Sequence, residues 1–259
     1  MEPDPKAVES PKAVLARARA ILGAFDAHTP SLGLNELTRR SGLPKATTHR
    51  LATSLVECGL LDREGRRYRL GRWLFELGQR APAHRSLRLA SAPFLEDLSR
   101  ATGETALLTL PGQDEILFGE KYVGARGRGQ IATMVEGRVP LNCSASGKIA
   151  LAFGDPANAE RFVNGELTKS TPFTMTAPDQ LRAEIERVHE LGYAVERQEL
   201  VVGSGAVAAP VFRNSQLVAC LTVVAPISRL DIARFAPAVL LAGRALSRAL
   251  GGGPAQVVR

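Results

Sequence analysis

Apolar residues recur at helical spacing along the first 60 residues and predict three short helices. The first runs from about Lys12 to Phe25, and the second begins near Leu34. The second helix ends at Ser41–Gly42, because glycine readily adopts the left-handed conformation that closes a helix. Pro44 then suits the first turn of a third helix, where a missing N–H costs nothing.

The third helix has one apolar face and one polar face. Its apolar face, which we expect to pack on the first two helices, consists of Thr48, Leu51, Ala52 and Leu55. The side chains that then point outward near its N-terminal half are Lys45, Thr47, His49 and Arg50.

A small basic hairpin follows this helix. Gly59 ends the helix, Leu60–Leu61 begins a strand, Glu64–Gly65–Arg66 makes the turn, and Tyr68–Leu70 returns. The arginines that this pairing brings to the tip are Arg63, Arg66 and Arg67. The order is typical of a winged helix-turn-helix, in which the N-terminal half of one helix enters the major groove of DNA and the wing lies on the neighbouring backbone.

Each of these features has a plainer interpretation when taken alone. A run of charge is usually a solvated face, and a single histidine such as His49 is more often a surface residue than a base contact. The combination of a tight turn, an outward polar face and a basic hairpin within about 10 residues is much less common by chance. Double-stranded DNA is therefore the predicted partner.

The rest of the chain alternates predicted helices with predicted strands. We expect a long helix at Leu87–Ala101, strands at Thr105–Leu110, Ile116–Tyr122 and about Gln130–Val135, helices near Lys148–Phe153 and at Pro178–Leu191, a hairpin of about Ala206–Phe212 and Leu217–Val224, and a last helix at about Asp231–Leu250. Antiparallel strands with helices segregated around them predict an α+β fold.

The distribution of charge agrees with a nucleic-acid partner. The chain has 259 residues, 45% of them apolar, and a formal net charge of +7. Residues 1–80 hold 14 Lys and Arg against 9 Asp and Glu, so most of the positive excess lies in the first third. This pattern favours a basic module joined to a nearly neutral one.

Cysteine usage and hydropathy predict a soluble cytoplasmic protein. Cys58, Cys143 and Cys220 are odd in number, far apart, and without metal-ligand spacing, which indicates reduced thiols. The polar start of the chain predicts no signal peptide, and no run approaches the roughly 20 apolar residues of a membrane span. We expect no membrane partner.

Motifs for catalysis or cofactor binding are absent from the sequence. There is no G-x-S-x-G elbow, no Walker loop and no G-x-G-x-x-G after a predicted strand, and the four histidines lack metal-ligand spacing. Cys143 beside Ser144 and Lys148 suggests a nucleophile, but no base lies near it in sequence, and a base from elsewhere in the fold stays open. We expect no enzyme, no cofactor and no metal.

Several segments resemble the IclR family of bacterial transcriptional regulators. Residues 42–61, GLPKATTHRLATSLVECGLL, and the YRLG that follows at 68–71 resemble the family's recognition helix and wing. Three later segments resemble family motifs in the family's order: PLNCSASGKIALA at 140–152, LGYAVERQELVVGSGAVAAPVF at 191–212 and LTVVAPISRL at 221–230. The resemblance covers roughly residues 12–250.

The resemblance implies an N-terminal winged helix-turn-helix, a linker helix and a C-terminal effector domain with a GAF/profilin-like α+β fold. The expected boundaries are a disordered tail at 1–11, a DNA-binding domain at 12–75, a linker at 76–84, an effector-binding and oligomerisation domain at 85–250, and a flexible tail at 251–259. It implies a ligand-responsive, sequence-specific regulator that binds inverted-repeat DNA as a homodimer or as a tetramer built from two dimers. Whether it represses or activates stays open.

The resemblance also implies where the small-molecule effector binds. The matching positions are Ala145, Ser146, Glu196, Ser204, Ala206, Thr222 and Val224. A helix that begins after Ser144 offers free N–H groups, which suit a carboxylate. In the alternative interpretation, the small residues only allow close packing and Glu196 is a solvated charge.

Departures from the family pattern bear on the ligand and the operator. Ala206 stands where cysteine is common, Val224 where serine is common, and Asn142 where histidine is common. The lost thiol and hydroxyl make the site less polar and predict an effector with an apolar or aromatic body, such as an aromatic acid. Ala46 and Thr48 replace the usual serine and valine, which leaves the operator sequence open. The alternative function is a winged helix fused to an enzymatic or non-sensing α+β domain.

Overall fold

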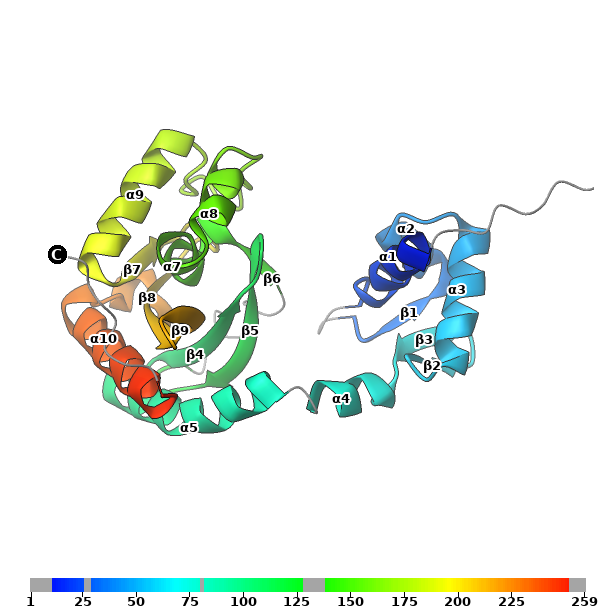
Figure 1. Cartoon of the computed structure of the whole chain (residues 1–259), viewed down its shortest axis with the longest axis horizontal. Helices are drawn as coiled ribbons and strands as arrows, with labels where there is room; N and C mark the ends of the chain where they lie inside the picture. The colour runs from blue at the N-terminus through cyan, green and yellow to red at the C-terminus, as the bar shows by residue number, and fades with distance from the viewer. Residues whose placement is uncertain (1–10, 26–28, 80–81, 128–137, 252–259) are drawn as a thin grey trace, which may run out of the picture. The chain divides into compact units, whose positions relative to one another are not determined.

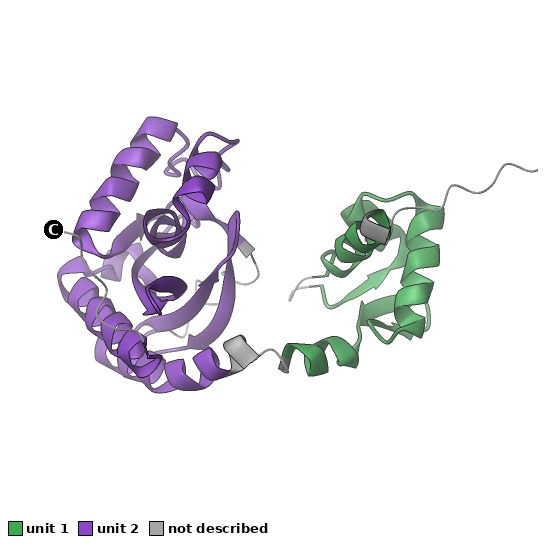
Figure 2. Cartoon of the chain, in the orientation of Figure 1, with its two compact units in different colours: residues 1–85 green, residues 86–259 purple. Residues whose placement is uncertain are grey.

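The chain divides into two compact units, residues 1–85 and 86–259 (Figure 2). The computed structural model describes residues 11–25, 29–79, 82–127 and 138–251. Each unit has its own hydrophobic core, which contains Ile21, Leu37 and Ala52 in the first unit and Leu95, Leu221 and Phe235 in the second.

The first unit packs helices against a small antiparallel sheet (Figure 1). Its elements are α1 (Pro11–Leu22), β1 (Ser31–Gly33), α2 (Leu34–Ser41), α3 (Lys45–Glu57), β2 (Leu61–Glu64), β3 (Arg67–Leu70) and α4 (Arg72–Gln79). The described strands pair in the order β1-β3-β2. Thr48, Ala52 and Leu55 of α3 are buried, as their spacing predicts. Gly42 closes α2 with φ of 68°, which confirms its predicted role.

Local sequence set some element ends differently from the prediction. α1 ends at Leu22, three residues early, because Gly23 follows and glycine has a low helix propensity; the Ala24 N–H then bonds to Ile21 O, three residues back, instead of continuing the α-helical pattern. α5 (Pro82–Thr102) begins at Pro82 instead of Leu87, since a proline at the start of a helix loses no hydrogen bond. The strand β1 was not predicted, because three residues are too few to show an alternating pattern.

The second unit contains, among its described residues, a six-stranded antiparallel sheet. Its strands are β4 (Thr105–Pro111), β5 (Glu115–Tyr122), β6 (Arg138–Pro140), β7 (Ala194–Arg197), β8 (Ser204–Arg213) and β9 (Gln216–Pro226), in the order β6-β5-β4-β9-β8-β7. The α+β fold is therefore confirmed. The strand predicted at about Gln130–Val135 lies outside the described residues.

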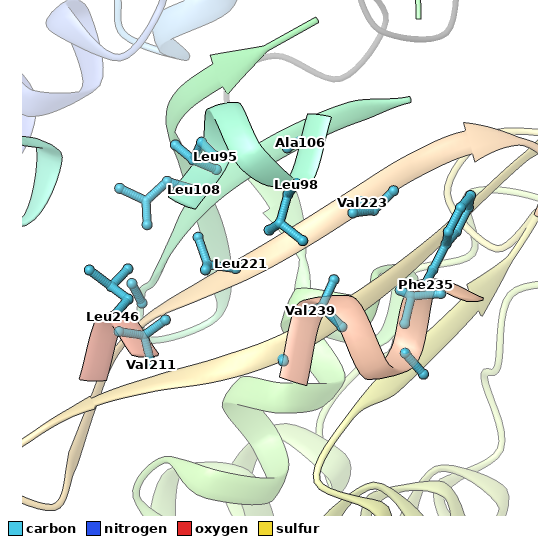
Figure 3. Close-up of a cluster of buried hydrophobic side chains, with 14 of the residues drawn as sticks. Leu95, Leu98, Ala106, Leu108, Val211, Leu221, Val223, Phe235, Val239 and Leu246 are labelled. Atoms are coloured by element: carbon cyan, nitrogen blue, oxygen red, sulfur yellow. The ribbon is translucent and has the colours of Figure 1, made fainter. Parts of the chain in front are cut away.

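Helices cover both faces of this sheet (Figure 1). One face packs against α5 and α10 (Ile232–Ala249), where Figure 3 shows Leu98 of α5 and Val239 of α10 meeting Leu221 and Val223 of β9. The other face packs against α7 (Ala145–Phe153) and α9 (Pro178–Leu191). Short 3-10 turns precede α7 (η1, Leu141–Cys143) and α10 (η2, Ile227–Arg229).

The helix α8 (Pro156–Val163) was not predicted, although its start carries a clear signal. Asp155 caps its N-terminus by accepting a hydrogen bond from the Ala157 N–H, and Pro156 stands in its first turn. Across the described ranges, no helix is both long and apolar enough to cross a bilayer.

Candidate functional site

The N-terminal half of α3 presents a polar surface. Lys45, His49 and Arg50 are exposed there, while Thr47 is half-buried. Lys45 and His49 stand four residues apart and so lie on one stripe of the helix. Thr48 faces the other way, and its hydroxyl donates to Pro44 O at 3.1 Å. The exposed surface of α3 is therefore polar and basic, and the opposite face of the helix packs against the core of the first unit.

The arginines of the hairpin differ in how they are held. Arg63 donates from Nε to Gly65 O at 3.1 Å, and its guanidinium lies 5.7 Å from the centre of the Tyr68 ring. Arg66 is exposed in the turn beside Gly65, whose φ is 59°. Arg67 instead bonds Ser31 of β1, with its Nε 2.7 Å from Ser31 Oγ. Arg67 therefore anchors the hairpin to β1, a role that the sequence did not predict.

A fourth basic residue of this hairpin is balanced by acids. Arg69 lies 3.0 Å from a carboxylate oxygen of Glu64 and 3.8 Å from one of Asp62. These acids offset the charge of Arg69, whereas Arg63, Arg66 and Arg67 form no ion pair among the described residues.

In the second unit, four buried residues form a row across the sheet on the face that α7 covers. Glu196 of β7 pairs with Ala206 of β8, Ala206 pairs with Val224 of β9, and Val224 pairs with Thr105 of β4. All four side chains are buried. Ser204 lies two residues along β8 from Ala206, on the same face and opposite Pro226. The row has an apolar centre and a polar group at each end.

The N-terminus of α7 contacts the neighbouring row of the sheet. The Ser146 hydroxyl lies 2.8 Å from the Thr222 hydroxyl, and both are buried. Ala145 packs in the same cluster as Ala206 and Val224. Ser144 caps the helix by accepting a hydrogen bond from the Gly147 N–H at 3.0 Å. The structure thus brings the predicted effector residues of α7, β7, β8 and β9 to one face.

Glu196 is a buried carboxyl group and not a solvated charge, since only 3% of it is exposed. Burial raises its pKa to about 7, although backbone N–H groups of Leu200 and Glu199 donate to its Oε1 and oppose the rise. A carboxyl group with this pKa is partly protonated near neutral pH. It can then donate a hydrogen bond to an acceptor as well as accept one.

Lys148 belongs to a buried ionic cluster beside the row. Its Nζ lies 2.7 Å from Glu199 Oε1, 2.9 Å from Val195 O and 3.6 Å from Glu184 Oε1. The sequence suggested Lys148 only as a neighbour of Cys143. Its partners were missed because Glu199 is 51 residues away along the chain.

Cys143 is not an activated nucleophile. Burial raises the pKa of its thiol, so the group stays protonated at neutral pH. Its Sγ accepts a hydrogen bond from Ser170 Oγ at 3.3 Å, and Lys148 is occupied by Glu199. Asn142 holds the same segment, because its amide donates to Thr168 O and Met175 O. Among the described residues, no cluster of three or more His, Cys, Asp or Glu side chains could hold a metal ion.

Comparison with known proteins places both units in one family. Residues 79–248 match the C-terminal domain of the bacterial transcriptional regulator IclR, and residues 14–65 match the IclR helix-turn-helix domain. The chain belongs to the IclR family of bacterial transcriptional regulators. The resemblance noted in its motifs is thereby confirmed.

Individual relatives match over nearly the whole chain. The chain is 31% identical over 246 residues to the HTH-type transcriptional regulator XynR of Escherichia coli. The matched region covers 91% of this chain and 96% of XynR. A crystal structure of a candidate IclR regulator from Silicibacter sp. TM1040 shares 30% identity and a TM-score of 0.83, and covers 95% of this chain and 99% of its own.

One solved IclR homologue contains a ligand. The homologue from Microbacterium hydrocarbonoxydans, complexed with 4-hydroxybenzoate, is 26% identical with a TM-score of 0.79, and covers 92% of this chain and 99% of its own. XynR is a transcriptional regulator, and members of the IclR family are not enzymes. This protein is accordingly a transcriptional regulator with a DNA-binding helix-turn-helix and a C-terminal effector domain.

Sequence reasoning missed one residue of the row on the face that α7 covers. Thr105 is 2% exposed and closes the row beside Val224, yet its hydroxyl has no hydrogen-bond partner among the described residues. The available signal was the predicted strand itself, because residues two apart on a strand share a face, and Thr105 therefore lies on the same face as Leu107, which α7 covers.

Proposed function

We propose that this regulator binds a small organic acid with an aromatic or apolar body on the face of the sheet beneath α7. The observation that carries the proposal is the row in which Ala206 and Val224 form an apolar centre between Glu196 and Thr105. An aromatic ring can pack against the apolar centre, and polar groups at opposite ends of the ligand can form hydrogen bonds with Glu196 and Thr105. The 4-hydroxybenzoate bound by the Microbacterium homologue has this distribution of polar groups.

DNA contacts come from α3 and from the wing formed by β2 and β3. Lys45, Thr47, His49 and Arg50 contact the major groove, while Arg63 and Arg66 contact the phosphate backbone. Arg67 approaches the backbone beside them while its guanidinium holds Ser31. One recognition helix reads too few base pairs for useful specificity, so the protein binds an inverted repeat as a dimer or a dimer of dimers.

Regulation then follows from linkage between the two units. A ligand changes DNA affinity only if it binds one arrangement of the DNA-binding units more tightly than another. The helices α4 and α5, which join the two units in sequence, are the proposed route for that choice.

The test is a fluorescence-anisotropy titration of the DNA upstream of the protein's own gene. The panel contains 4-hydroxybenzoate, benzoate, neutral benzamide, and the two- and three-carbon acids glyoxylate and pyruvate. The aromatic acids are expected to shift DNA affinity by about fivefold or more, the lower end of typical allosteric coupling. A shift with only glyoxylate or pyruvate would exclude the proposed effector class.

A matched pair of variants ties the response to the face. Ala206→Leu fills the apolar centre and is expected to abolish the shift while DNA affinity without ligand stays within twofold. Ala238→Leu on α10 adds the same side chain to the opposite face of the sheet, in the core built around Val239, and should leave the shift intact. Loss of the response in both variants would indicate general damage to the unit instead of a blocked site.

A further inference from the structure

A cavity lies in the second unit outside the row proposed for the effector. Its volume is about 460 Å³, within the range of small-molecule sites, and it opens among Glu104, Arg126, Arg229, Asp231 and Arg234. These residues come from the start of β4, the segment that follows β5, the 3-10 turn η2 and the first turn of α10. None of the seven predicted effector residues lines it.

One side of the cavity is a fixed ion pair. Glu104 is only 1% exposed, and it accepts Arg229 Nε at 2.7 Å and Arg229 Nη2 at 2.9 Å. The same Nη2 donates to the backbone oxygen of Arg126 at 3.0 Å. Arg229 is therefore held in one orientation, and its positive charge is balanced by Glu104. A rigid wall of this kind reduces the entropy that a ligand loses on binding.

The other two arginines form no ion pair among the described residues, and the cavity has one more arginine than acid. Arg126 makes no side-chain hydrogen bond or ion pair with the described residues, although its backbone N–H is fixed by Gly103 O at 2.8 Å. Arg234 bonds Ala101 O through Nη2 and has no acidic partner in the described part of the chain. The remaining acid, Asp231, caps α10 by accepting from the Arg234 N–H at 3.1 Å. Three arginines thus face two acids, both already engaged.

We propose that this cavity is a second ligand site, which takes a small organic dicarboxylate. Two guanidinium groups without acidic partners, Arg126 and Arg234, suit two carboxylates because a guanidinium fork matches carboxylate geometry. The volume exceeds what one inorganic anion fills. The site is independent of the effector proposed for the face beneath α7, since the two share no residue.

The probe is succinate, titrated into the purified full-length protein by calorimetry at low ionic strength. Wild type is expected to bind one succinate per chain, and the neutral succinamide is expected not to bind. Arg126→Gln should weaken succinate by about tenfold or more, the range of a lost charge-assisted hydrogen bond. Arg244→Gln, an exposed arginine further along α10, carries the same charge change and should stay within twofold.

Four outcomes would overturn the proposal. These are no succinate binding by wild type, equal weakening in Arg126→Gln and Arg244→Gln, inorganic phosphate binding with no succinate binding, and loss of succinate binding in Ala206→Leu. The last outcome would place succinate on the face beneath α7. Conversely, if 4-hydroxybenzoate still shifts the DNA affinity of Arg126→Gln, the two sites are separate. Failure of one proposal then leaves the other standing.

Discussion

The ammonium nitrogen of Lys148 lies 2.7 Å from Oε1 of Glu199, and both side chains are buried. The same nitrogen lies 3.6 Å from Glu184 Oε1 on α9 and donates to Val195 O on β7. One cation therefore ties α7 to α9, to β7 and to the loop after β7. Removing a buried charge from such a pair leaves its partners buried without compensation.

Lys148→Met is therefore expected to lower the free energy of unfolding by about 3–5 kcal/mol. Urea denaturation followed by circular dichroism measures the change, and the exposed Lys169→Met should stay within about 0.5 kcal/mol of wild type. The double variant Lys148→Met/Glu199→Gln should be more stable than Lys148→Met, because it removes one stranded carboxylate. A double variant that is no more stable would contradict this account of the cluster.

Glu196 predicts a dependence of stability on pH. Burial raises its pKa to about 7 from an ordinary value of 4.5, so the folded protein holds this proton more tightly than the unfolded chain. Its stabilising contribution is full below about pH 4.5 and is lost as pH rises through 7. The loss is about 3 kcal/mol by linkage.

Glu196→Gln should remove that dependence. The variant, compared with wild type by urea denaturation between pH 4.5 and 8, should gain relative stability as pH rises to about 7 and then level off. The exposed Glu186→Gln, whose carboxyl is not buried, serves as the control and should follow wild type throughout. A wild-type minus Glu196→Gln difference that does not vary with pH would show that Glu196 titrates normally.

The regular elements were predictable from the sequence because their signals are local. The apolar face of α3 and the glycine that closes α2 depend on neighbours within a few residues, and both are as predicted. The short strand β1 depends instead on pairing with β3, in which Ser31 lies opposite Arg69. No local pattern encodes such a partner.

The candidate effector face shows the same division. Resemblance to the family motifs predicted that Ser146 and Thr222 lie on this face. Nothing in their local sequence indicates that their hydroxyls meet, because the two residues are 76 positions apart. Thr105 carries no motif and reaches the row only through the long-range pairing of β4 with β9. Glu196 had two open interpretations, and only the fold showed its burial.

The exposed face of α3 leads to a prediction about base reading. Arg50 is exposed in the N-terminal half of the helix that we propose enters the major groove. Arg50→Ala should weaken operator binding by ~1–3 kcal/mol and weaken binding to random DNA much less, because a base contact is lost. Anisotropy titrations on both DNAs, with Arg244→Ala as control, measure this. An equal loss on both would show that Arg50 contacts only phosphate.

The wing leads to a different prediction, because its contacts are proposed to be with phosphate. Arg66→Ala should weaken operator and random DNA alike, and the slope of log affinity against log salt should fall in magnitude by about one. Arg69→Ala provides the matched control, since Arg69 already pairs with Glu64 and should change the slope less. A loss confined to the operator would instead indicate that Arg66 reads sequence.

Removing the hydroxyl of Thr105 is expected to raise the stability of the ligand-free protein and to weaken its binding of the effector. Its buried hydroxyl has no hydrogen-bond partner in the described ranges, and such a group costs about 1–3 kcal/mol. Thr105→Val keeps the shape and removes the hydroxyl, so the ligand-free protein should become more stable to urea by about 1 kcal/mol.

If the Thr105 hydroxyl forms a hydrogen bond with the effector, the same variant should bind 4-hydroxybenzoate about tenfold less tightly in calorimetry. Benzoate, which lacks the second polar group, should bind both proteins within twofold. A variant that gains stability and still binds 4-hydroxybenzoate as wild type does would remove Thr105 from the effector site.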